Sequence, residues 1–201
     1  GTLTLTGTGG PGSSSEGINI EEASGETNTL GSATAGEQSG NIKLIADTFW
    51  FNTDNTDNTD NTNRILGTGT LTIEPLGASF SSAFSTSGLT LGSALTGLTL
   101  GKSGNTADIT VASSYGASIA GPISVYGGNI AINAGLISTG TGTGARITLK
   151  ASGNITDGAS GYVQTANVNS LIEMADLREA QRTYEANINV VKRHTKPNPQ
   201  A

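Results

Sequence analysis

Apolar and polar residues alternate in short segments over the first 160 residues of the chain. The clearest segments are residues 17–20, 41–46, 108–112, 129–134 and 146–151, and in each an Ile follows a glycine or a polar residue. Successive side chains of a β-strand point to opposite faces, so this alternation predicts strands with one buried face.

The segments recur at a spacing that suggests a repeat. Ile109, Ile130 and Ile147 are separated by 21 and 17 residues, and glycine-rich turns lie between them. A shorter repeat, Gly-Leu-Thr-Leu-Gly, occupies residues 88–92 and 97–101. A period near 20 residues is typical of one coil of a β-solenoid, in which each coil buries a few aliphatic side chains.

The pattern changes to a helical one near the C-terminus. From Ser170 onward the chain contains no glycine, and Ser170 with Glu173 forms a capping box. Apolar residues then recur at alternating spacings of 3 and 4, with one polar position, which predicts a heptad seam. The seam consists of Met174, Leu177, Gln181, Tyr184, Ile188 and Val191. The helix should run for about 23 residues, or roughly 35 Å.

These patterns predict a mainly β fold followed by a single long C-terminal α-helix. We expect two domains: residues 1–160 form Gly/Thr/Ser-rich β-solenoid repeats, and residues 161–201 form the helix and a polar tail. The helical seam has no helical partner elsewhere in the chain. It therefore either docks on the β region or pairs with helices of other chains. The chain opens at Gly1 without an initiating Met, which suggests a piece of a longer product.

Composition and charge exclude several classes of function. The chain has no Cys, so disulfides and thiolate metal sites are excluded. Residues 1–160 hold 5 basic and 12 acidic residues, a net charge of −7, which argues against nucleic acid as a partner. No apolar run is long enough to span a bilayer.

Two short segments could bind ligands but have simpler explanations. Residues 52–63 read Asn-Thr-Asp three times and then Asn-Thr-Asn, and their oxygens would suit Ca²⁺. Because they lack the interleaved glycines of calcium-binding repeats, we interpret them as a low-complexity polar loop. Phe49, Trp50 and Phe51 could form an exposed binding patch. We favour packing of this cluster inside the β region.

Nothing in the sequence assembles a catalytic, cofactor-binding or metal site. The one histidine, His194, lies in the charged end of the tail and is too isolated for a catalytic triad or a zinc site. Residues 140–145 match a Gly-x-Gly-x-x-Ala dinucleotide fingerprint, but a strand follows where that motif requires a helix. We therefore expect a protein that is not an enzyme and takes no cofactor. A polysaccharide-active β-helix enzyme is the weakest alternative.

The repeat segments carry a first resemblance to a known family. Residues 121–134 and 147–156 resemble the haemagglutinin-like repeats of large bacterial surface adhesins of the two-partner secretion and autotransporter types. The resemblance extends well over residues 65–160 and loosely over 1–50. It implies a right-handed parallel β-helix.

The tail resembles a different family. The segments 161–163, 167–169, 173–177 and 182–187 resemble the C-terminal signature of bacterial flagellar rod and hook proteins, most closely the proximal rod proteins. In that family an Asn-Val-Asn turn leads into a C-terminal helix that packs with an N-terminal helix, which is missing here. The resemblance adds to the seam the candidate self-assembly residues Asn167, Asn169 and Asn187.

Two structural functions follow from these resemblances. The main expectation is a non-enzymatic, exported protein of the cell surface, an adhesin whose solenoid presents loops to a host-surface or carbohydrate ligand. The alternative is a component of the flagellar basal-body rod, with an atypical β region, whose partners are other flagellar axial subunits or further copies of itself through the C-terminal helix. Both hypotheses place the protein outside the cytoplasm.

Overall fold

The computed structural model describes residues 1–9, 16–20, 28–32, 40–51, 63–112, 118–158, 163–164, 181–185 and 188. The chain divides into two compact units, Gly1–Ala166 and Asn167–Ala201. The first unit contains every strand found among the described residues, and each unit is described by itself.

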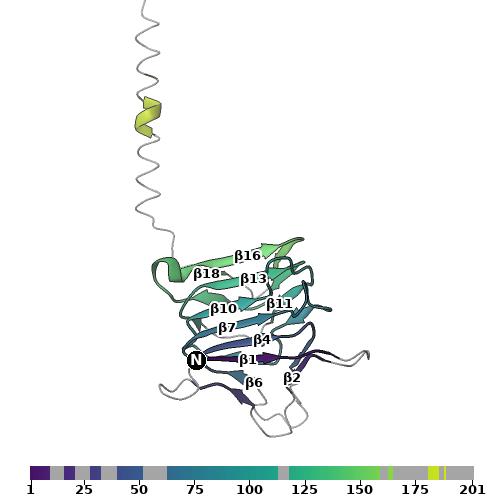
Figure 1. Cartoon of the computed structure of the whole chain (residues 1–201). Helices are drawn as coiled ribbons and strands as arrows, with labels where there is room; N and C mark the ends of the chain where they lie inside the picture. Colours follow the sequence, from purple (N-terminus) through teal and green to yellow (C-terminus); the bar gives the residue numbers. More distant parts are fainter. Residues whose placement is uncertain are drawn as a thin grey trace, which may run out of the picture. The chain divides into compact units, whose positions relative to one another are not determined.

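The largest sheet takes every third strand of the chain, and all of its strands run parallel. Figure 1 shows these strands stacked in chain order, from the purple first strand to the green last one. They are β1 (Thr2–Thr6), β4 (Asn41–Ile45), β7 (Thr70–Glu74), β10 (Gly97–Leu100), β13 (Ile123–Gly127) and β16 (Ile147–Ala151).

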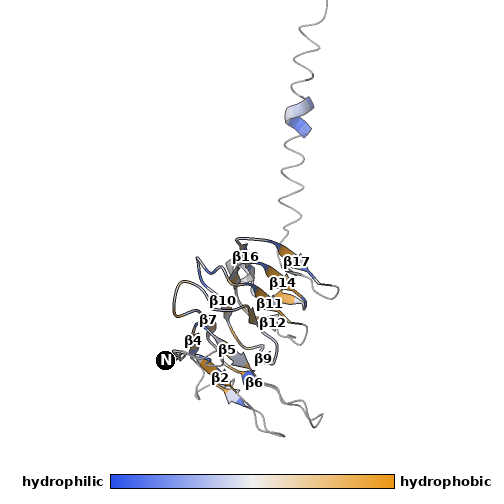
Figure 2. Ribbon diagram, turned by 90° about the vertical axis from the view of Figure 1, so that its right-hand side faces the viewer, coloured by the Kyte–Doolittle hydropathy of each residue, from blue (hydrophilic) through white to orange (hydrophobic). Residues whose placement is uncertain are grey.

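The intervening strands stack in the same way. One series comprises β2 (Ile18–Ile20) with β5 (Phe49–Phe51), and β8 (Phe84–Ser85) with β11 (Ile109–Val111), β14 (Ile130–Ile132) and β17 (Ile155–Asp157). The other comprises β3 (Thr29–Leu30), β6 (Asn63–Ile65) and β9 (Leu89–Leu91), and then β12 (Ser118–Ile119), β15 (Leu136–Ser138) and β18 (Val163–Gln164). Figure 2 shows β11, β14 and β17 stacked beside the largest sheet. The prediction of a mainly β body is confirmed, with parallel pairing throughout the described strands.

The alternating pattern places one aliphatic row over another in the largest sheet. Strict register aligns the first inward row, which consists of Leu3, Ile42, Leu71, Leu98, Ile123 and Ile147. The second inward row consists of Leu5, Leu44, Ile73, Leu100, Val125 and Leu149. The four middle residues of each row are buried, whereas the first and last are only half-buried. The core therefore runs along the stack and is incompletely covered at both ends.

The register corrects the repeat that the sequence suggested. Ile109 pairs with Ile130, 21 residues later, as expected. Ile130, however, pairs with Ile155 and not with Ile147. Ile147 belongs to the largest sheet, where it pairs with Ile123. The predicted spacing of 17 therefore joined strands of two different sheets, and the paired residues at this end of the stack are 24 and 25 positions apart.

An aromatic cluster packs at the series of strands that contains β5 and β8. Phe49 lies edge-on to Phe80 and Phe84, with ring centroids 5.8 and 5.7 Å away, and Phe51 lies 6.2 Å from Phe84. Trp50 points outward and is 53% exposed. Packing inside the β region is thus confirmed for the two phenylalanines, while the indole between them faces solvent.

Asn105 is a buried polar residue whose side chain connects three levels of the stack by hydrogen bonds. A level is a set of three consecutive strands, one from each stacked series. Its Oδ1 accepts hydrogen bonds from the backbone N–H of Phe80 at 3.1 Å and from Ser79 Oγ at 2.8 Å. Its Nδ2 donates to the carbonyl of Tyr126 at 2.7 Å. The side chain therefore satisfies backbone groups that the turns leave outside the ladders.

Exposed polar residues make a second set of links, at the positions that precede Ile109, Ile130 and Ile155 of β11, β14 and β17. Asp108 Oδ1 accepts hydrogen bonds from the backbone N–H and from Nδ2 of Asn129, and Asn129 Oδ1 accepts one from the backbone N–H of Asn154. The backbone N–H of Asn129, followed by its side chain, lowers the pKa of Asp108 below its usual value. The polar residue that precedes Ile in the sequence pattern thus connects one level of the stack to the next.

Residues 181–185 and 188 of the second unit are helical. The other residues of the predicted helix, and residues 52–62 of the predicted loop, lie outside the described residues. The long C-terminal helix is therefore not seen. The division at residue 160 stays a prediction beside the division that the structure makes after Ala166.

Candidate assembly regions

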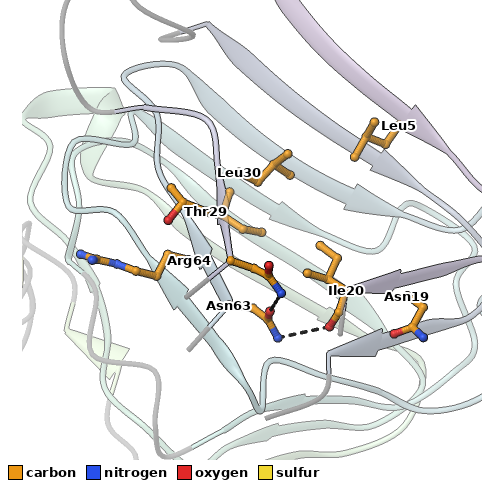
Figure 3. Close-up of a pocket in the computed structure, with 9 residues that line it drawn as sticks. Leu5, Asn19, Ile20, Thr29, Leu30, Asn63 and Arg64 are labelled. Atoms are coloured by element: carbon orange, nitrogen blue, oxygen red, sulfur yellow. Dashed lines mark hydrogen bonds between the residues drawn. The ribbon is translucent and has the colours of Figure 1, made fainter. Parts of the chain in front are cut away.

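A cavity opens where the first three strands end the stack. It has a volume of about 330 Å³ and is bounded by residues of β1, β2, β3 and β6 (Figure 3). Leu5, Ile20 and Leu30 give it an apolar lining. These three side chains are only partly buried and pack against the buried core. The cavity is thus a place where the core meets the surface.

The polar part of the cavity lining is held by hydrogen bonds. Asn63 is 1% exposed, receives a hydrogen bond from Asn28 Nδ2 at 3.2 Å, and donates one to the carbonyl of Ile20 at 3.3 Å. Arg64 also lines the cavity. The buried amide of Asn63 therefore links β6 to β2 and to Asn28, which precedes β3.

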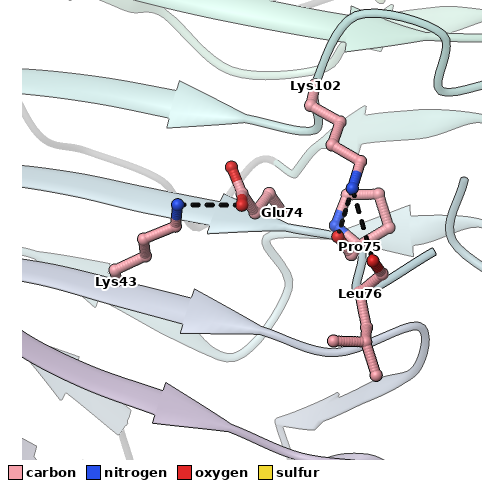
Figure 4. A network of polar contacts seen from close by, with 5 residues as sticks. All are labelled: Lys43, Glu74, Pro75, Leu76 and Lys102. Carbon is pink, nitrogen blue, oxygen red and sulfur yellow. Dashed lines mark hydrogen bonds and ion pairs between the residues drawn. The ribbon is translucent and has the colours of Figure 1, made fainter. Parts of the chain in front are cut away.

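Three lysines on or beside the largest sheet contact a neighbouring strand or turn. Lys43 Nζ lies 2.9 Å from Glu74 Oε1, across the β4–β7 pair, and Lys102 Nζ donates to the carbonyl of Pro75 at 2.9 Å (Figure 4). Lys150 lies over the ring of Tyr126, 5.8 Å from its centroid. These contacts hold neighbouring strands and turns together.

The described residues contain no group of three or more His, Asp or Glu side chains that could hold a metal ion. Likewise, no helix within the described ranges has the length and apolar character that a membrane crossing requires. The absence of a catalytic or cofactor site stays a prediction.

Three of the predicted self-assembly residues are described, all in the second unit. Gln181 and Tyr184 lie on the helical segment 181–185 and are exposed, with Tyr184 at 67%, and Ile188 is half-buried. Their spacing of 3 and 4 places them on one side of a helix. The remaining predicted residues lie outside the described part of the chain. They are Asn167, Asn169, Met174, Leu177, Asn187 and Val191.

The cavity at the first three strands was not predicted from the sequence. Strands β2 and β3 contribute only three and two residues, so the alternating pattern over them is short. The one sequence signal was the segment Thr2–Thr6, which alternates perfectly between Thr and Leu.

One family model matches the C-terminal part of the chain. Residues 159–195 match the family described as flagellar basal body rod FlgEFG protein, C-terminal. The chain is also 52% identical over 40 residues to the flagellar basal-body rod protein FlgC of Agrobacterium fabrum. That match covers 20% of this chain and 29% of the relative, so the chain spans less than a third of that protein. No solved structure matches the chain.

These matches confirm the resemblance of residues 161–192 to flagellar rod proteins and overturn the main functional expectation. The expectation of a surface adhesin was wrong, and the host-surface or carbohydrate ligand rested on it alone. The Gly/Thr/Ser-rich repeats on which it was based suit parallel strands joined by tight turns, and such a composition identifies no ligand. The resemblance of residues 1–160 to haemagglutinin-like repeats is not shown.

Proposed function

We propose that the chain is a non-enzymatic structural component of a bacterial flagellar basal body, joined to neighbouring axial subunits through residues 159–195. The observation that carries this proposal is the match of that segment to the rod family, together with 52% identity to a rod protein over 40 residues. The flagellum is accordingly its proposed location, outside the cytoplasm.

The described part of the tail supports a role in assembly. Tyr184 is 67% exposed on a helical segment that also exposes Gln181, and Ile188 follows one turn later. An exposed aromatic side chain at a seam position is a contact that another helix can bury. Helix pairing between subunits would therefore cover the side chains that the second unit presents.

The β unit serves in this proposal as a rigid parallel β-solenoid, right-handed as most parallel crossovers are. The three-strand period of the pairings and the continuous inward rows support that architecture. Residues 159–195 would join this β unit to the axial structure.

Sedimentation velocity of the full chain over a range of concentrations tests the role of the tail. Burial of an aromatic side chain contributes about 1.5–3 kcal/mol, so Tyr184→Ala should weaken association through the tail about 10- to 100-fold. Arg182→Ala is the matched control, because Arg182 is also exposed on this segment but lies off the seam. Equal association of both variants and the parent chain would refute a seam at Tyr184.

A further inference from the structure

The last level of the β stack comprises β16, β17 and β18, and its inward side chains are poorly covered. Ile155 of β17 is 50% exposed, although its register partner Ile130 is 0% exposed and Ile109, one level further in, is 1% exposed. Figure 2 shows β17 at the end of its series, beside β14. The same inward position is therefore buried in the two preceding levels and half open in the last one.

Strand β16 shows the same difference in the largest sheet. Its inward residues Ile147 and Leu149 are half-buried. Their register partners on β13, Ile123 and Val125, are both 0% exposed. The free energy gained by burying an aliphatic side chain scales with the apolar area that is removed from water. The last level therefore gains less stability from its core residues than the level of β13, β14 and β15 beneath it.

Asp157 reduces the core of the last level further. It pairs with Ile132 of β14, an inward residue that is 1% exposed, and thus occupies an inward position of β17. In the level before that, the position is taken by the buried Val111. A carboxylate is costly to remove from water, and Asp157 is exposed. A position that buries an aliphatic side chain in two successive levels therefore buries none in the last.

The backbone hydrogen bonds of the last level are, in contrast, as short as those of the level beneath it. The N–H of Gly158 donates to the carbonyl of Ile132 at 2.8 Å. Asn133 occupies the equivalent position one level inward, and its N–H donates to the carbonyl of Val111 at 2.9 Å. The two levels therefore differ in the burial of their side chains and not in the geometry of their ladders.

We propose that the last level is a conformational unit that opens as a whole while the level of β13, β14 and β15 stays folded. Its opening separates three strand pairs on one side, those with β13, β14 and β15. It exposes little further apolar surface, because its own inward residues are already partly in contact with water. Opening the level beneath would also separate rows of fully buried aliphatic side chains, which costs more free energy.

The opening lengthens the connection that leads from β15 to the second unit. It frees residues 147–164, which span up to roughly 60 Å when extended. The level would thus act as an extensible connection between the rest of the β unit and the segment that matches the rod family. This role rests on the function proposed above, whereas the opening itself concerns the first unit alone.

Native-state hydrogen exchange of the full chain, followed residue by residue by NMR, tests the opening. The N–H groups of Gly158 and Asn133 form one matched pair of reporters. Gly153 and Gly128 form a second pair, since they donate to the carbonyls of Gly128 and Ala107 at 2.7 and 2.8 Å. After correction for intrinsic rates, Gly158 and Gly153 should exchange at least about 100-fold faster than their partners, with one common free energy of opening. Equal protection within each pair would overturn the proposal, and so would fast exchange of Gly158 alone, which would indicate fraying of one strand.

A disulfide across the boundary gives an independent test, because the chain has no Cys of its own. Ser124 and Thr148 are register partners on β13 and β16, and neighbouring strands lie about 4.8 Å apart, which is within the range of a disulfide. Oxidised Ser124→Cys/Thr148→Cys should slow the exchange of Gly153 at least about tenfold, and reduction should restore it. Thr99→Cys/Ser124→Cys places the same bridge one level inward and should leave this rate unchanged. If the first bridge has no effect, or both bridges slow exchange equally, the level does not open at this boundary.

A substitution at the inward position of β17 tests the energetic argument. Asp157→Val places an aliphatic side chain there and should slow the exchange of Gly158 and Gly153 about tenfold. Thr156→Val changes the outward neighbour on the same strand and should leave both rates nearly unchanged. Equal effects of the two variants would refute the dependence of the opening on inward burial. Tyr184→Ala should leave the exchange rates of the last level unchanged, which separates this proposal from association through the tail.

Discussion

Asn105 should contribute more to the stability of the β unit than its exposed neighbours in the turns. Asn105→Ala would leave the buried N–H of Phe80 and the carbonyl of Tyr126 without the partners that Asn105 supplies. An unsatisfied buried backbone group costs about 1–3 kcal/mol. Because the side chain is only 4% exposed, water has little access to replace both bonds. We therefore expect a loss of about 2–5 kcal/mol in the free energy of unfolding.

Urea denaturation followed by circular dichroism measures this loss, and Asn129→Ala provides a matched control. Asn129 is the same residue type and also links two levels, by accepting from the N–H of Asn154 at 2.9 Å, but it is exposed. Water can replace that bond, so Asn129→Ala should cost less than about 1 kcal/mol. Equal losses for the two variants would show that burial of the amide does not determine its contribution.

Three other predictions concern the β unit. Gly101→Ala should lower the free energy of unfolding of the β unit by at least about 1–2 kcal/mol in urea denaturation, because φ is +73° and the added Cβ would lie 2.3 Å from the carbonyl oxygen of Tyr126. Gly104 has a φ of +91° but open space around it, so Gly104→Ala should cost only the backbone strain of about 1 kcal/mol. The hydrogen bonds from Asn129 lower the pKa of Asp108, so the stability that this carboxylate adds is full above its usual pKa of about 3.9 and is lost as the pH falls through the lowered value. The difference in urea midpoint between the parent chain and Asp108→Asn should therefore shrink between pH 6 and pH 2.5, and an unchanged difference would contradict this assignment. Glu74→Gln should change the free energy of unfolding by less than about 1 kcal/mol, because the Lys43–Glu74 pair is partly exposed, and a larger loss would mean that the pair is better shielded than its exposure indicates.

The alternation of apolar and polar residues was sufficient to predict β2, β4, β11, β14 and β16, because side-chain direction in a strand has a period of two. Many of the other strands, β7 among them, were not predicted from it. It was insufficient to assign the strands to sheets. The segments that begin at Ile130 and Ile147 look alike in sequence, yet they belong to different sheets. The resemblance arises because both strands direct their aliphatic residues into the same core. Sheet assignment depends on the turns between strands, whose lengths vary from level to level.

The contribution of Asn105 could not be predicted from the sequence for a related reason. Asparagine is common in exposed turns, and only the stacking of three levels places this one against Phe80 and Tyr126. Asn63 at the cavity is a second example, since its partner Asn28 lies 35 residues away. The residues of the tail, in contrast, formed an ordered motif within one short segment, which is why the resemblance to rod proteins could be recognised from the sequence.

The central claim is that residues 159–195 join the chain to flagellar axial subunits, and incorporation into flagella tests it most directly. A tagged chain and its Tyr184→Ala and Arg182→Ala variants would be produced in Agrobacterium fabrum, whose FlgC the chain resembles, and basal bodies would be purified. We predict that the parent chain and Arg182→Ala copurify with basal bodies, and that the yield of Tyr184→Ala falls at least tenfold. Absence of the parent chain from basal bodies, despite its stable production in the cells, would contradict the claim.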